Sequence, residues 1–421
     1  MNISLVGINH QTATVTIREK VAISAERLND SLLLLHAYVP YGIILSTCNR
    51  TEIYTASNDG RRIQEASLNF LKARTNNSDA GLLRHIYLSS DKAAVEHLFR
   101  VACGLESMIV GEYEVLGQVS QALEAAEKAG MVNLSLRYVF QGAIRTGRRV
   151  RQETGISKNT LSVSSVAVDL AADVLGNLQN ARILVIGAGE TGRLVVKVAK
   201  ERGASQIVVA SRTRERATAL AATLGGVPID LSNLTEELST ANIVVACAGA
   251  PHSILGVSQV AESMRKRSES PLVIIDIAVP RNVEPAVERI NSVFLYNIDD
   301  LTRIANSHRK QRKGEIQKAE AIIATEVDKF VSRWRVLKIQ PVIGALMTKA
   351  EDIRSTQLKK TLKRLRPLSS KEQESLEAMT RSIVTKILKD PIQCLKANAD
   401  GDGDYAGMIS KIFRLDKRKK E

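Results

Sequence analysis

The sequence contains few cysteines and no long hydrophobic run. Its four cysteines, Cys48, Cys103, Cys247 and Cys394, form no CxxC pair, so neither a zinc site nor a disulfide framework is predicted. No apolar run approaches the roughly 18 residues of a membrane span, and the N-terminus MNISLVGINH lacks the basic start and the cleavage site of a signal peptide. We therefore expect a cytoplasmic protein in which each thiol must be judged separately.

Acidic residues are scarce in the last third of the chain. Residues 301–421 hold 28 lysines and arginines against 15 acidic residues, an excess of 13 out of a net charge of +14. Such a segment suggests a polyanionic partner such as nucleic acid. Because aromatic residues make up only 4% of the chain and do not interleave with the basic ones, solvated helical faces explain the excess equally well.

The length of 421 residues predicts two or three domains. Residues 1–156 alternate strand-like and helix-like patterns, which indicates a compact α/β domain. From 181 to 297, apolar strands such as ILVI and VIID alternate with helical segments. This order predicts right-handed β-α-β units, a parallel sheet and a Rossmann-like domain, which we assign to residues 157–298.

Proline is absent between Pro285 and Pro341, and we predict one helix from about 299 to 338. Its apolar residues follow three-four spacing at positions 316, 319, 323, 327, 330, 334 and 337. Such a helix needs a partner along its apolar stripe. Further helices are predicted from Pro341 to about 365 and from about 371 to 388, the latter opened by a capping box of Ser369 and Glu372.

The simplest interpretation of residues 299–421 is a long spinal helix that carries a helical dimerisation domain. The alternative is a helical bundle that folds back on the first two domains. The predicted fold class is therefore multidomain, α/β plus α.

A glycine-rich loop follows the first strand of the predicted Rossmann domain. In ILVIGAGETGRLV, Gly187, Gly189 and Gly192 have GxGxxG spacing between a strand and a helix. Gly187 permits the tight turn, Gly189 lets the backbone approach a pyrophosphate, and Gly192 allows close packing of helix on strand. The loop, with Ala188, Glu190 and Thr191, is predicted to bind a dinucleotide.

The next strand ends in ASRTRER, without the acidic residue that would bind the ribose of NAD. Ser211, Arg212 and Thr213 can instead hold a 2′-phosphate, and a guanidinium is well suited to bidentate contact. NADPH is therefore favoured over NADH. The alternative is that the arginines are simply exposed residues at the start of a helix.

Cys48 lies between two strand-like runs in YGIILSTCNRTEIYTAS. The guanidinium of Arg50 is expected either to lower the pKa of the thiol, which favours the nucleophilic thiolate, or to bind a substrate carboxylate. His97 is the candidate acid/base, although a lone histidine on a helix is more often structural. Cys103 and Cys247 lie in apolar patterns and are interpreted as packing residues.

A nucleophilic cysteine combined with a nicotinamide domain implies a particular chemistry. Attack of the thiolate on an activated acyl group gives a thioester, which accepts hydride more readily than an ester does. Hydride addition gives a thiohemiacetal that collapses to an aldehyde. The residues alone therefore predict an acyl reductase with a covalent thioester.

At this point the chain resembles a known family, the glutamyl-tRNA reductases. The resemblance runs over nearly the whole chain, through the segments GINH, LSTCNRTEIY, HLFRVACGLESMIVGE, GQV, GAGETG and DIAVPRNVEP. It implies reduction of glutamyl-tRNA to glutamate-1-semialdehyde with NADPH, the first step of tetrapyrrole synthesis from glutamate, in a V-shaped homodimer. It also implies Cys48 as the nucleophile and His97 as functionally important. The glutamyl-binding residues that it implies are Thr47, Asn49, Arg50, Ser107, Glu112, Tyr113, Glu114 and Gln118.

The chain departs from the family pattern at Glu114, where glutamine is usual. An ionised carboxylate there could accept hydrogen bonds from the substrate ammonium group but could not donate one. The C-terminal segment DPIQCLKANAD retains only a generic helical pattern, so no function is carried onto it. The resemblance leaves open whether an aminomutase receives the aldehyde.

Two other functions compete with this interpretation. The first is an NADP-dependent dehydrogenase of a small metabolite, similar to shikimate dehydrogenase, which leaves Cys48 and the basic helical segment without a role. The second is a nucleotide-sensing scaffold that binds tRNA without chemistry, and its supporting feature is the basic C-terminal third.

Overall fold

The computed structural model describes residues 2–57, 59–74, 81–157, 162–267, 270–309, 312–397 and 405–415. It divides into two compact units, residues 1–324 and 325–421. We refer to 2–157 as the N-terminal region, to 162–309 as the parallel-sheet region, and to 325–415 as the helical unit. The first two belong to the same compact unit. No helix in the described ranges is long and apolar enough to cross a membrane.

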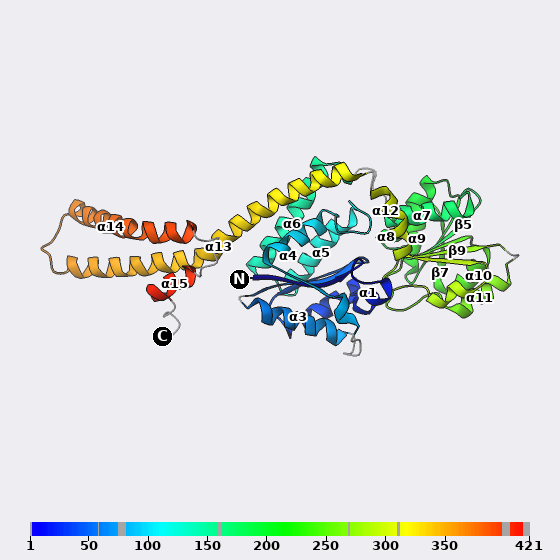
Figure 1. Cartoon of the computed structure of the whole chain (residues 1–421), viewed down its shortest axis with the longest axis horizontal. Helices are drawn as coiled ribbons and strands as arrows, with labels where there is room; N and C mark the ends of the chain where they lie inside the picture. The colour runs from blue at the N-terminus through cyan, green and yellow to red at the C-terminus, as the bar shows by residue number, and fades with distance from the viewer. Residues whose placement is uncertain are drawn as a thin grey trace. The chain divides into compact units, whose positions relative to one another are not determined.

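The N-terminal region is a four-stranded antiparallel sheet with the strand order β2-β3-β1-β4. One face packs against α3 and the other against α4, α5 and α6 (Figure 1). Its elements are β1 (Asn2–Asn9), α1 (Val15–Val21), η1 (Ala25–Arg27), α2 (Leu28–His36), β2 (Gly42–Ser46), β3 (Arg50–Ser57), α3 (Gly60–Arg74), η2 (Leu82–His85), β4 (Tyr87–Ser90), α4 (Asp91–Ala102), α5 (Glu114–Lys128) and α6 (Leu134–Glu153).

The parallel-sheet region has six strands in the order β10-β9-β8-β5-β6-β7, and every neighbouring pair is parallel. The predicted Rossmann-like sheet is therefore confirmed. Its elements are α7 (Val163–Leu175), β5 (Arg182–Ile186), α8 (Glu190–Glu201), β6 (Gln206–Ser211), α9 (Arg214–Leu224), β7 (Val227–Asp230), η3 (Leu231–Asn233), α10 (Leu234–Thr240), β8 (Ile243–Ala246), α11 (Val257–Arg265), β9 (Leu272–Asp276), η4 (Pro285–Arg289), β10 (Val293–Asn297) and α12 (Ile298–Arg309).

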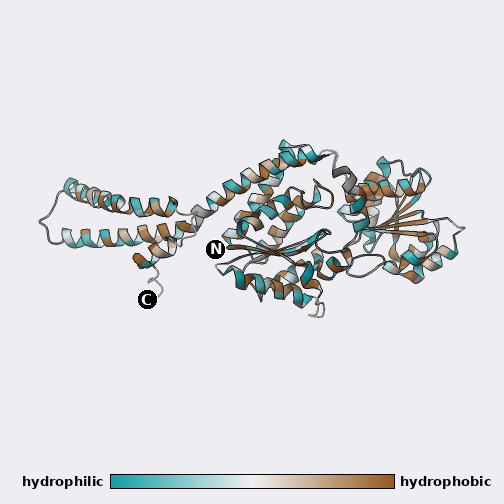
Figure 2. Ribbon diagram, viewed as in Figure 1, coloured by the Kyte–Doolittle hydropathy of each residue, from teal (hydrophilic) through white to brown (hydrophobic). Residues whose placement is uncertain are grey.

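Both faces of the parallel sheet are buried, which is why its inner strands are continuous runs of hydrophobic residues (Figure 2). Helices α7, α8 and α9 cover one face, and α10 and α11 cover the other. The chain passes from β5 to β6 and β7 on one side and then returns to β8 on the other. This reversal opens a crevice at the carboxyl ends of β5, β6 and β8, the usual position of a ligand in such sheets.

The sequence analysis missed β7, which is short and lies at the edge of the sheet. It contains Pro228, and Val227 is 55% exposed. Proline cannot donate a hydrogen bond within a sheet and is confined largely to edges. An apolar run was therefore absent at the place where the strand forms.

The helical unit comprises most of α13 (Lys313–Leu362), with α14 (Ser370–Ala397) and α15 (Tyr405–Ile412). Ile339 and Ile343 of α13 pack against Leu395 of α14. The predicted capping box opens α14, because Glu372 accepts from the Ser369 amide at 2.8 Å and its own amide donates to the Ser369 hydroxyl at 3.4 Å.

Two predicted boundaries in this part of the chain are wrong. The predicted single helix from 299 to 338 is described as two helices, α12 (Ile298–Arg309) and α13 (Lys313–Leu362), and residues 310 and 311 lie outside the described residues. Helix α13 then continues through Pro341 instead of breaking there. A proline inside a helix costs one backbone hydrogen bond, and here the buried Ile339, Ile343 and Leu346 on either side keep the helix packed.

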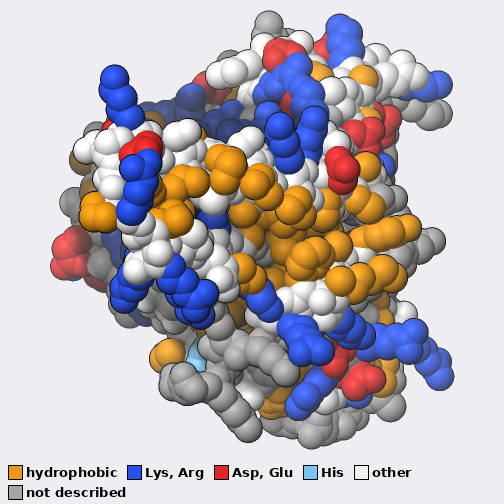
Figure 3. All heavy atoms as spheres, turned by 90° about the vertical axis from the view of Figure 1, so that its left-hand side faces the viewer, with side chains coloured by type: hydrophobic (Ala, Val, Ile, Leu, Met, Phe, Trp, Pro, Cys, Tyr) orange, Lys and Arg blue, Asp and Glu red, His pale blue; other side chains and the backbone are white. Residues whose placement is uncertain are grey.

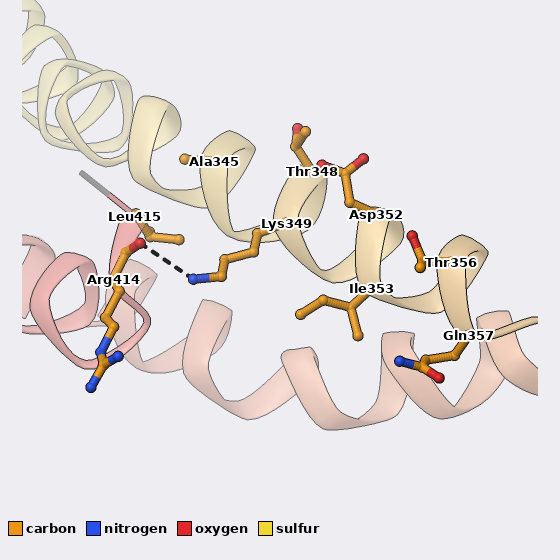
Figure 4. Close-up of a pocket in the computed structure, with 9 residues that line it drawn as sticks. All are labelled: Ala345, Thr348, Lys349, Asp352, Ile353, Thr356, Gln357, Arg414 and Leu415. Carbon is orange, nitrogen blue, oxygen red and sulfur yellow. Dashed lines mark hydrogen bonds between the residues drawn. The ribbon is translucent and has the colours of Figure 1, made fainter. Parts of the chain in front are cut away.

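Part of the last helix is held against α13 by a lysine. The ammonium group of Lys349 donates to the carbonyl of Phe413 at 2.6 Å, just after the C-terminal end of α15. It also donates to the carbonyl of Arg414 at 3.3 Å (Figure 4). Such a cation satisfies carbonyls that have no partner within their own helix. Beside this contact lies a groove of about 590 Å³ whose lining includes Thr348, Asp352 and Ile353.

Candidate active site

Cys48 lies on the loop between β2 and β3, which is stabilised by its own hydrogen bonds. The Thr47 amide donates to the Arg50 carbonyl at 2.8 Å, and the Asn49 amide donates to the Thr47 hydroxyl at 3.1 Å. The half-buried thiol packs against a small hydrophobic cluster that includes Met108 and Ile298. Because Ile298 begins α12, the thiol lies where the N-terminal and parallel-sheet regions meet.

The thiol is not activated in this arrangement. Burial raises the pKa of Cys48 to about 12, the charges of Glu112 and Glu114 act in the same direction, and Arg18 opposes them. The expectation that Arg50 lowers this pKa is therefore wrong. The Arg50 side chain is instead turned into the core, where its guanidinium contacts Glu52.

Arg50 is 1% exposed and already has partners within the protein. One terminal nitrogen donates to Glu52 Oε1 at 2.9 Å, and the other donates to the carbonyl of Glu106. Its Nε has no hydrogen-bond partner among the described residues. A substrate carboxylate bound by Arg50 would therefore have to reach Nε or displace one of these partners.

Glu52 is the centre of a buried polar network that the sequence analysis missed. Its carboxylate accepts from the hydroxyls of Tyr54 and Tyr87 and from Arg50, and it lies 2.8 Å from Nε2 of His97. Burial opposes the charge, but His97 and Arg50 hold the pKa of Glu52 well below its usual range. The network therefore contains a buried charge that remains ionised.

A sequence signal for this network was present. Arg50, Glu52 and Tyr54 alternate along β3, so their side chains project from the same face of the strand. Polar residues with period two on a central strand indicate a buried polar cluster. His97 joins the cluster from α4, and its ring centroid is 5.6 Å from that of Tyr87.

The candidate glutamyl-binding residues fall into two groups. Near the thiol, Asn49 donates from Nδ2 to Glu112 Oε1 at 3.1 Å, and both side chains are buried. Ser107 is buried as well. Tyr113 is 63% exposed and has the guanidinium of Arg151 5.9 Å from its ring centroid. Arg50 belongs instead to the Glu52 network, together with the candidate acid/base His97.

Glu114 connects this site to the glycine loop. It lies in the first turn of α5, and Gln118 follows one turn later on the same helix. Burial raises the pKa of Glu114 to about 7, with further contributions from Glu112 and from Glu190 at the start of α8. Near neutral pH a protonated fraction of Glu114 can also donate a hydrogen bond, which the ionised carboxylate cannot.

The glycine loop has the geometry predicted for it. Gly187 has φ of +123°, which favours glycine. A Cβ at Gly192 would lie 1.9 Å from the Gly187 carbonyl oxygen, whereas a Cβ at Gly189 would meet nothing within 4 Å. Gly192 is therefore required for packing, and Gly189 leaves open space at the N-terminus of α8, where a pyrophosphate is favoured.

A cavity of about 650 Å³ opens beside this loop. Among the predicted cofactor residues, Gly187, Ala188, Gly189, Ser211, Arg212 and Thr213 line it, whereas Glu190, Thr191 and Gly192 form the first turn of α8 behind it. Residues 24–26 of the N-terminal region line the same cavity. Its size, its open glycine and its cationic rim fit a dinucleotide.

Helix α1 ties the two regions together through ion pairs that the sequence did not reveal. Glu19 accepts from Arg281 at 2.6 and 2.9 Å, and Arg18 donates to Asp299 at 3.0 Å. The second carboxylate oxygen of Asp299 also accepts from the Val15 amide at 2.8 Å. These contacts place the Cys48 loop beside the parallel-sheet region.

Three family models match successive parts of the chain. Residues 6–154 match "Glutamyl-tRNAGlu reductase, N-terminal domain", residues 169–304 match "Shikimate / quinate 5-dehydrogenase", and residues 318–415 match "Glutamyl-tRNAGlu reductase, dimerisation domain". The second match supports a nicotinamide cofactor, and the third supports a homodimer. Because the dehydrogenase match covers the middle of the chain alone, the small-metabolite dehydrogenase interpretation is wrong for the whole protein.

Full-length comparisons agree with these matches. The chain is 39% identical over 423 residues to the glutamyl-tRNA reductase of Natranaerobius thermophilus, with 99% of this chain and 92% of that protein covered. It is 42% identical to the Moorella thermoacetica enzyme, with 97% and 94% covered. The solved glutamyl-tRNA reductase of Methanopyrus kandleri is 33% identical with a TM-score of 0.50, and 95% of this chain and 99% of that chain are covered. The chain therefore belongs to the glutamyl-tRNA reductase family.

Proposed function

We propose that this chain reduces glutamyl-tRNA to glutamate-1-semialdehyde with NADPH, through a glutamyl thioester on Cys48. The reaction would be the first step of tetrapyrrole biosynthesis from glutamate, by way of 5-aminolevulinate. The observation that supports it is the position of the Cys48 thiol, which packs against Ile298 at the start of α12, in the same compact unit as the glycine loop. A nucleophile and a dinucleotide crevice thus belong to one unit.

The proposed division of labour follows three segments. Residues 1–156 bind the glutamyl group and carry the nucleophile, residues 157–298 bind the cofactor, and residues 299–421 form the spinal helix and the dimerisation domain. Within the first segment, we assign glutamyl contacts to Thr47, Asn49, Arg50, Ser107, Glu112, Tyr113, Glu114 and Gln118. His97 is assigned a catalytic role that depends on its contact with Glu52.

Activation of the thiol can come from the substrate itself. Glu112 and Glu114 both raise the pKa of Cys48, so a positive charge between them would lower it. The α-ammonium group of a glutamyl ester carries such a charge and would stabilise the thiolate. The thiol would thus stay protonated and unreactive until the correct aminoacyl group binds.

The covalent step then balances without any further reagent. The thiolate forms a bond to the ester carbonyl carbon, the bond from that carbon to the terminal ribose oxygen of tRNA breaks, and the freed oxygen takes up a proton. When bound, a nicotinamide cofactor supplies the hydride that converts an acyl group to an aldehyde. The resulting thiohemiacetal then loses its carbon–sulfur bond, so that the hydroxyl-bearing carbon becomes the aldehyde and the hydroxyl proton, passed to the sulfur, leaves Cys48 as a free thiol.

Three features support NADPH as the cofactor. Strand β6 ends at Ser211 without an acidic residue, and Ser211, Arg212 and Thr213 all line the cavity. A second guanidinium, that of Arg216, lines it as well. Positive charge at this edge suits the 2′-phosphate that distinguishes NADPH from NADH.

The proposed product is an α-amino aldehyde, which reacts readily with other amines. Direct transfer to glutamate-1-semialdehyde aminomutase would protect it, and we include that enzyme as a proposed partner. The proposed location is the cytoplasm, where aminoacyl-tRNA is made.

The experiment that tests this function follows NADPH oxidation by absorbance while the aldehyde is trapped chemically. Glutamyl-tRNA should support oxidation, whereas free glutamate and uncharged tRNA should not. Cys48→Ser should abolish aldehyde formation, because a serine hydroxyl is a much weaker nucleophile than a thiolate and forms no acyl-enzyme. Undiminished activity in that variant would contradict the covalent route.

A further inference from the structure

Arg212, the residue that the proposed function assigns to the 2′-phosphate, already has an anionic partner. Its Nη2 donates to Glu26 Oε1 at 2.7 Å. Glu26 lies in η1 of the N-terminal region, 186 positions away in sequence, and both side chains are about two-thirds exposed. A carboxylate from the other region therefore contacts one terminal nitrogen of the guanidinium that would receive the phosphate.

This contact lies at the cofactor cavity itself. Ser24, Ala25 and Glu26 line the cavity together with Gly187–Gly189 and Arg212. Two residues after Arg212, at the start of α9, Arg214 donates to Asp230 at 3.1 Å. Two of the three arginines near the end of β6 thus contact carboxylates, and only the partner of Arg212 comes from outside the parallel-sheet region.

A 2′-phosphate and the Glu26 carboxylate cannot occupy the same face of Arg212 at once. The phosphate carries nearly two negative charges and three acceptor oxygens, so it should displace a single exposed carboxylate. The phosphate must nevertheless replace the contact between Arg212 and Glu26, and the displaced carboxylate remains nearby as a like charge. This free-energy cost lowers the affinity for NADPH alone, because NADH has a hydroxyl in place of the 2′-phosphate.

We propose that Glu26 competes with the 2′-phosphate of the cofactor for Arg212, and so links cofactor binding to release of η1 from the parallel-sheet region. This inference rests on the proposed assignment of Arg212. It makes Glu26 a specificity-determining residue that lowers the preference for NADPH over NADH. It also predicts that binding of NADPH loosens one of the contacts between the two regions while leaving those of α1 in place.

The test measures dissociation constants of NADPH and NADH for the full-length protein by fluorescence titration. Glu26→Gln keeps the size of the side chain but removes its charge. It should tighten NADPH binding about two- to five-fold, the range expected for one exposed ion pair, and leave NADH binding unchanged. The gain should shrink at high salt, because salt screens exposed charges.

Glu19→Gln is the matched control. It breaks an ion pair between the same two regions, that of Arg281, but does not touch Arg212, so it should leave the ratio of the two affinities unchanged. An equal gain in NADPH affinity in Glu19→Gln would show that loosening any contact between the two regions favours NADPH binding. That result would overturn the proposal.

Arg212→Gln separates this inference from the proposed cofactor preference. It should weaken NADPH binding and remove the effect of Glu26→Gln in the double variant. If Arg212→Gln weakens NADPH binding but Glu26→Gln does not tighten it, competition by Glu26 is wrong and the cofactor assignment stands. If Arg212→Gln leaves NADPH binding unchanged, the 2′-phosphate assignment fails and the competition fails with it.

Discussion

Single residues determine how the thiol region of this site responds to pH, and Glu114 is the clearest case. It lies at the start of α5, close enough to Cys48, Glu112 and Glu190 for their charges to interact. Burial and the two neighbouring carboxylates raise its pKa from 4.5 to about 7. The folded protein therefore keeps a proton on Glu114 that the unfolded chain would release between about pH 4.5 and 7.

This shift predicts a pH-dependent effect of Glu114→Gln on stability. Because the folded state binds more protons in that window, the wild-type protein loses stability as pH rises through it, whereas glutamine does not titrate. The variant should gain stability relative to wild type between pH 5 and pH 8, by at most about 3 kcal/mol at 1.36 kcal/mol per pKa unit. Thermal unfolding at both pH values measures the difference, and a difference that is the same at both would contradict the shift.

The residues that sequence reasoning found and missed differ in a physical respect. Cys48 and the three glycines could be named as candidates from the sequence because their proposed roles depend on local context, a loop between strands or a turn into a helix. Glu52 was missed because its role depends on Tyr87 and His97, which only the folded sheet brings to it. The alternation of Arg50, Glu52 and Tyr54 along β3 did signal a shared face, but not which partners that face would meet.

At the scale of elements, two of the three glycines around the β5–α8 turn have roles that can be separated. Gly192 packs against the carbonyl of Gly187, and Gly189 faces open space. One glycine therefore supports the fold, and the other leaves room for a ligand. The spacing in the sequence predicted both roles, because each follows from local backbone geometry.

Alanine substitutions should separate the two roles. Gly192→Ala places a Cβ 1.9 Å from a backbone oxygen, so it should lower the unfolding midpoint and weaken nicotinamide cofactor binding at least ten-fold. Gly189→Ala should leave the midpoint within a degree or so, since nothing is contacted, and still weaken binding because the Cβ points into the space for the pyrophosphate. Equal unfolding midpoints in the two variants, or a Gly189→Ala protein that binds the cofactor as tightly as wild type, would refute this assignment.

The long helices show the limit of element prediction. Their existence and the capping box of α14 followed from apolar spacing and local side chains. The continuation of α13 through Pro341 and of α14 through Pro391 did not. Proline is a local signal for a break, and it is overridden here by packing between helices that are distant in sequence.

At the scale of the whole molecule, the helical unit has a hydrophobic surface that a single chain leaves exposed. Met379, Ile383 and Ile387 of α14 are 52%, 49% and 65% exposed, and their four-residue spacing places them on one face of the helix. Figure 3 shows hydrophobic side chains exposed on the face of the molecule that it draws. Together with the dimerisation-domain match, this face of α14 is expected to bind a second copy.

Ile387→Asp should therefore convert the homodimer to a monomer, because burying an unpaired carboxylate in an apolar interface is costly. Sedimentation or light scattering measures the mass. Leu134→Asp is the control, since Leu134 is 83% exposed on the N-terminal region, and it should leave the dimer intact. A dimeric Ile387→Asp protein would place the interface on another face.

The central claim is that Cys48 carries the glutamyl group. The most direct measurement mixes the full-length protein with glutamyl-tRNA labelled on the glutamyl group, without NADPH, and locates the label by mass spectrometry of the digested protein after acid quench. The label should be found as a thioester on the peptide containing Cys48, should disappear in Cys48→Ser, and should persist in Cys394→Ser, which removes an exposed thiol elsewhere. A protein that forms the aldehyde on later addition of NADPH while Cys48 is never labelled would contradict the account.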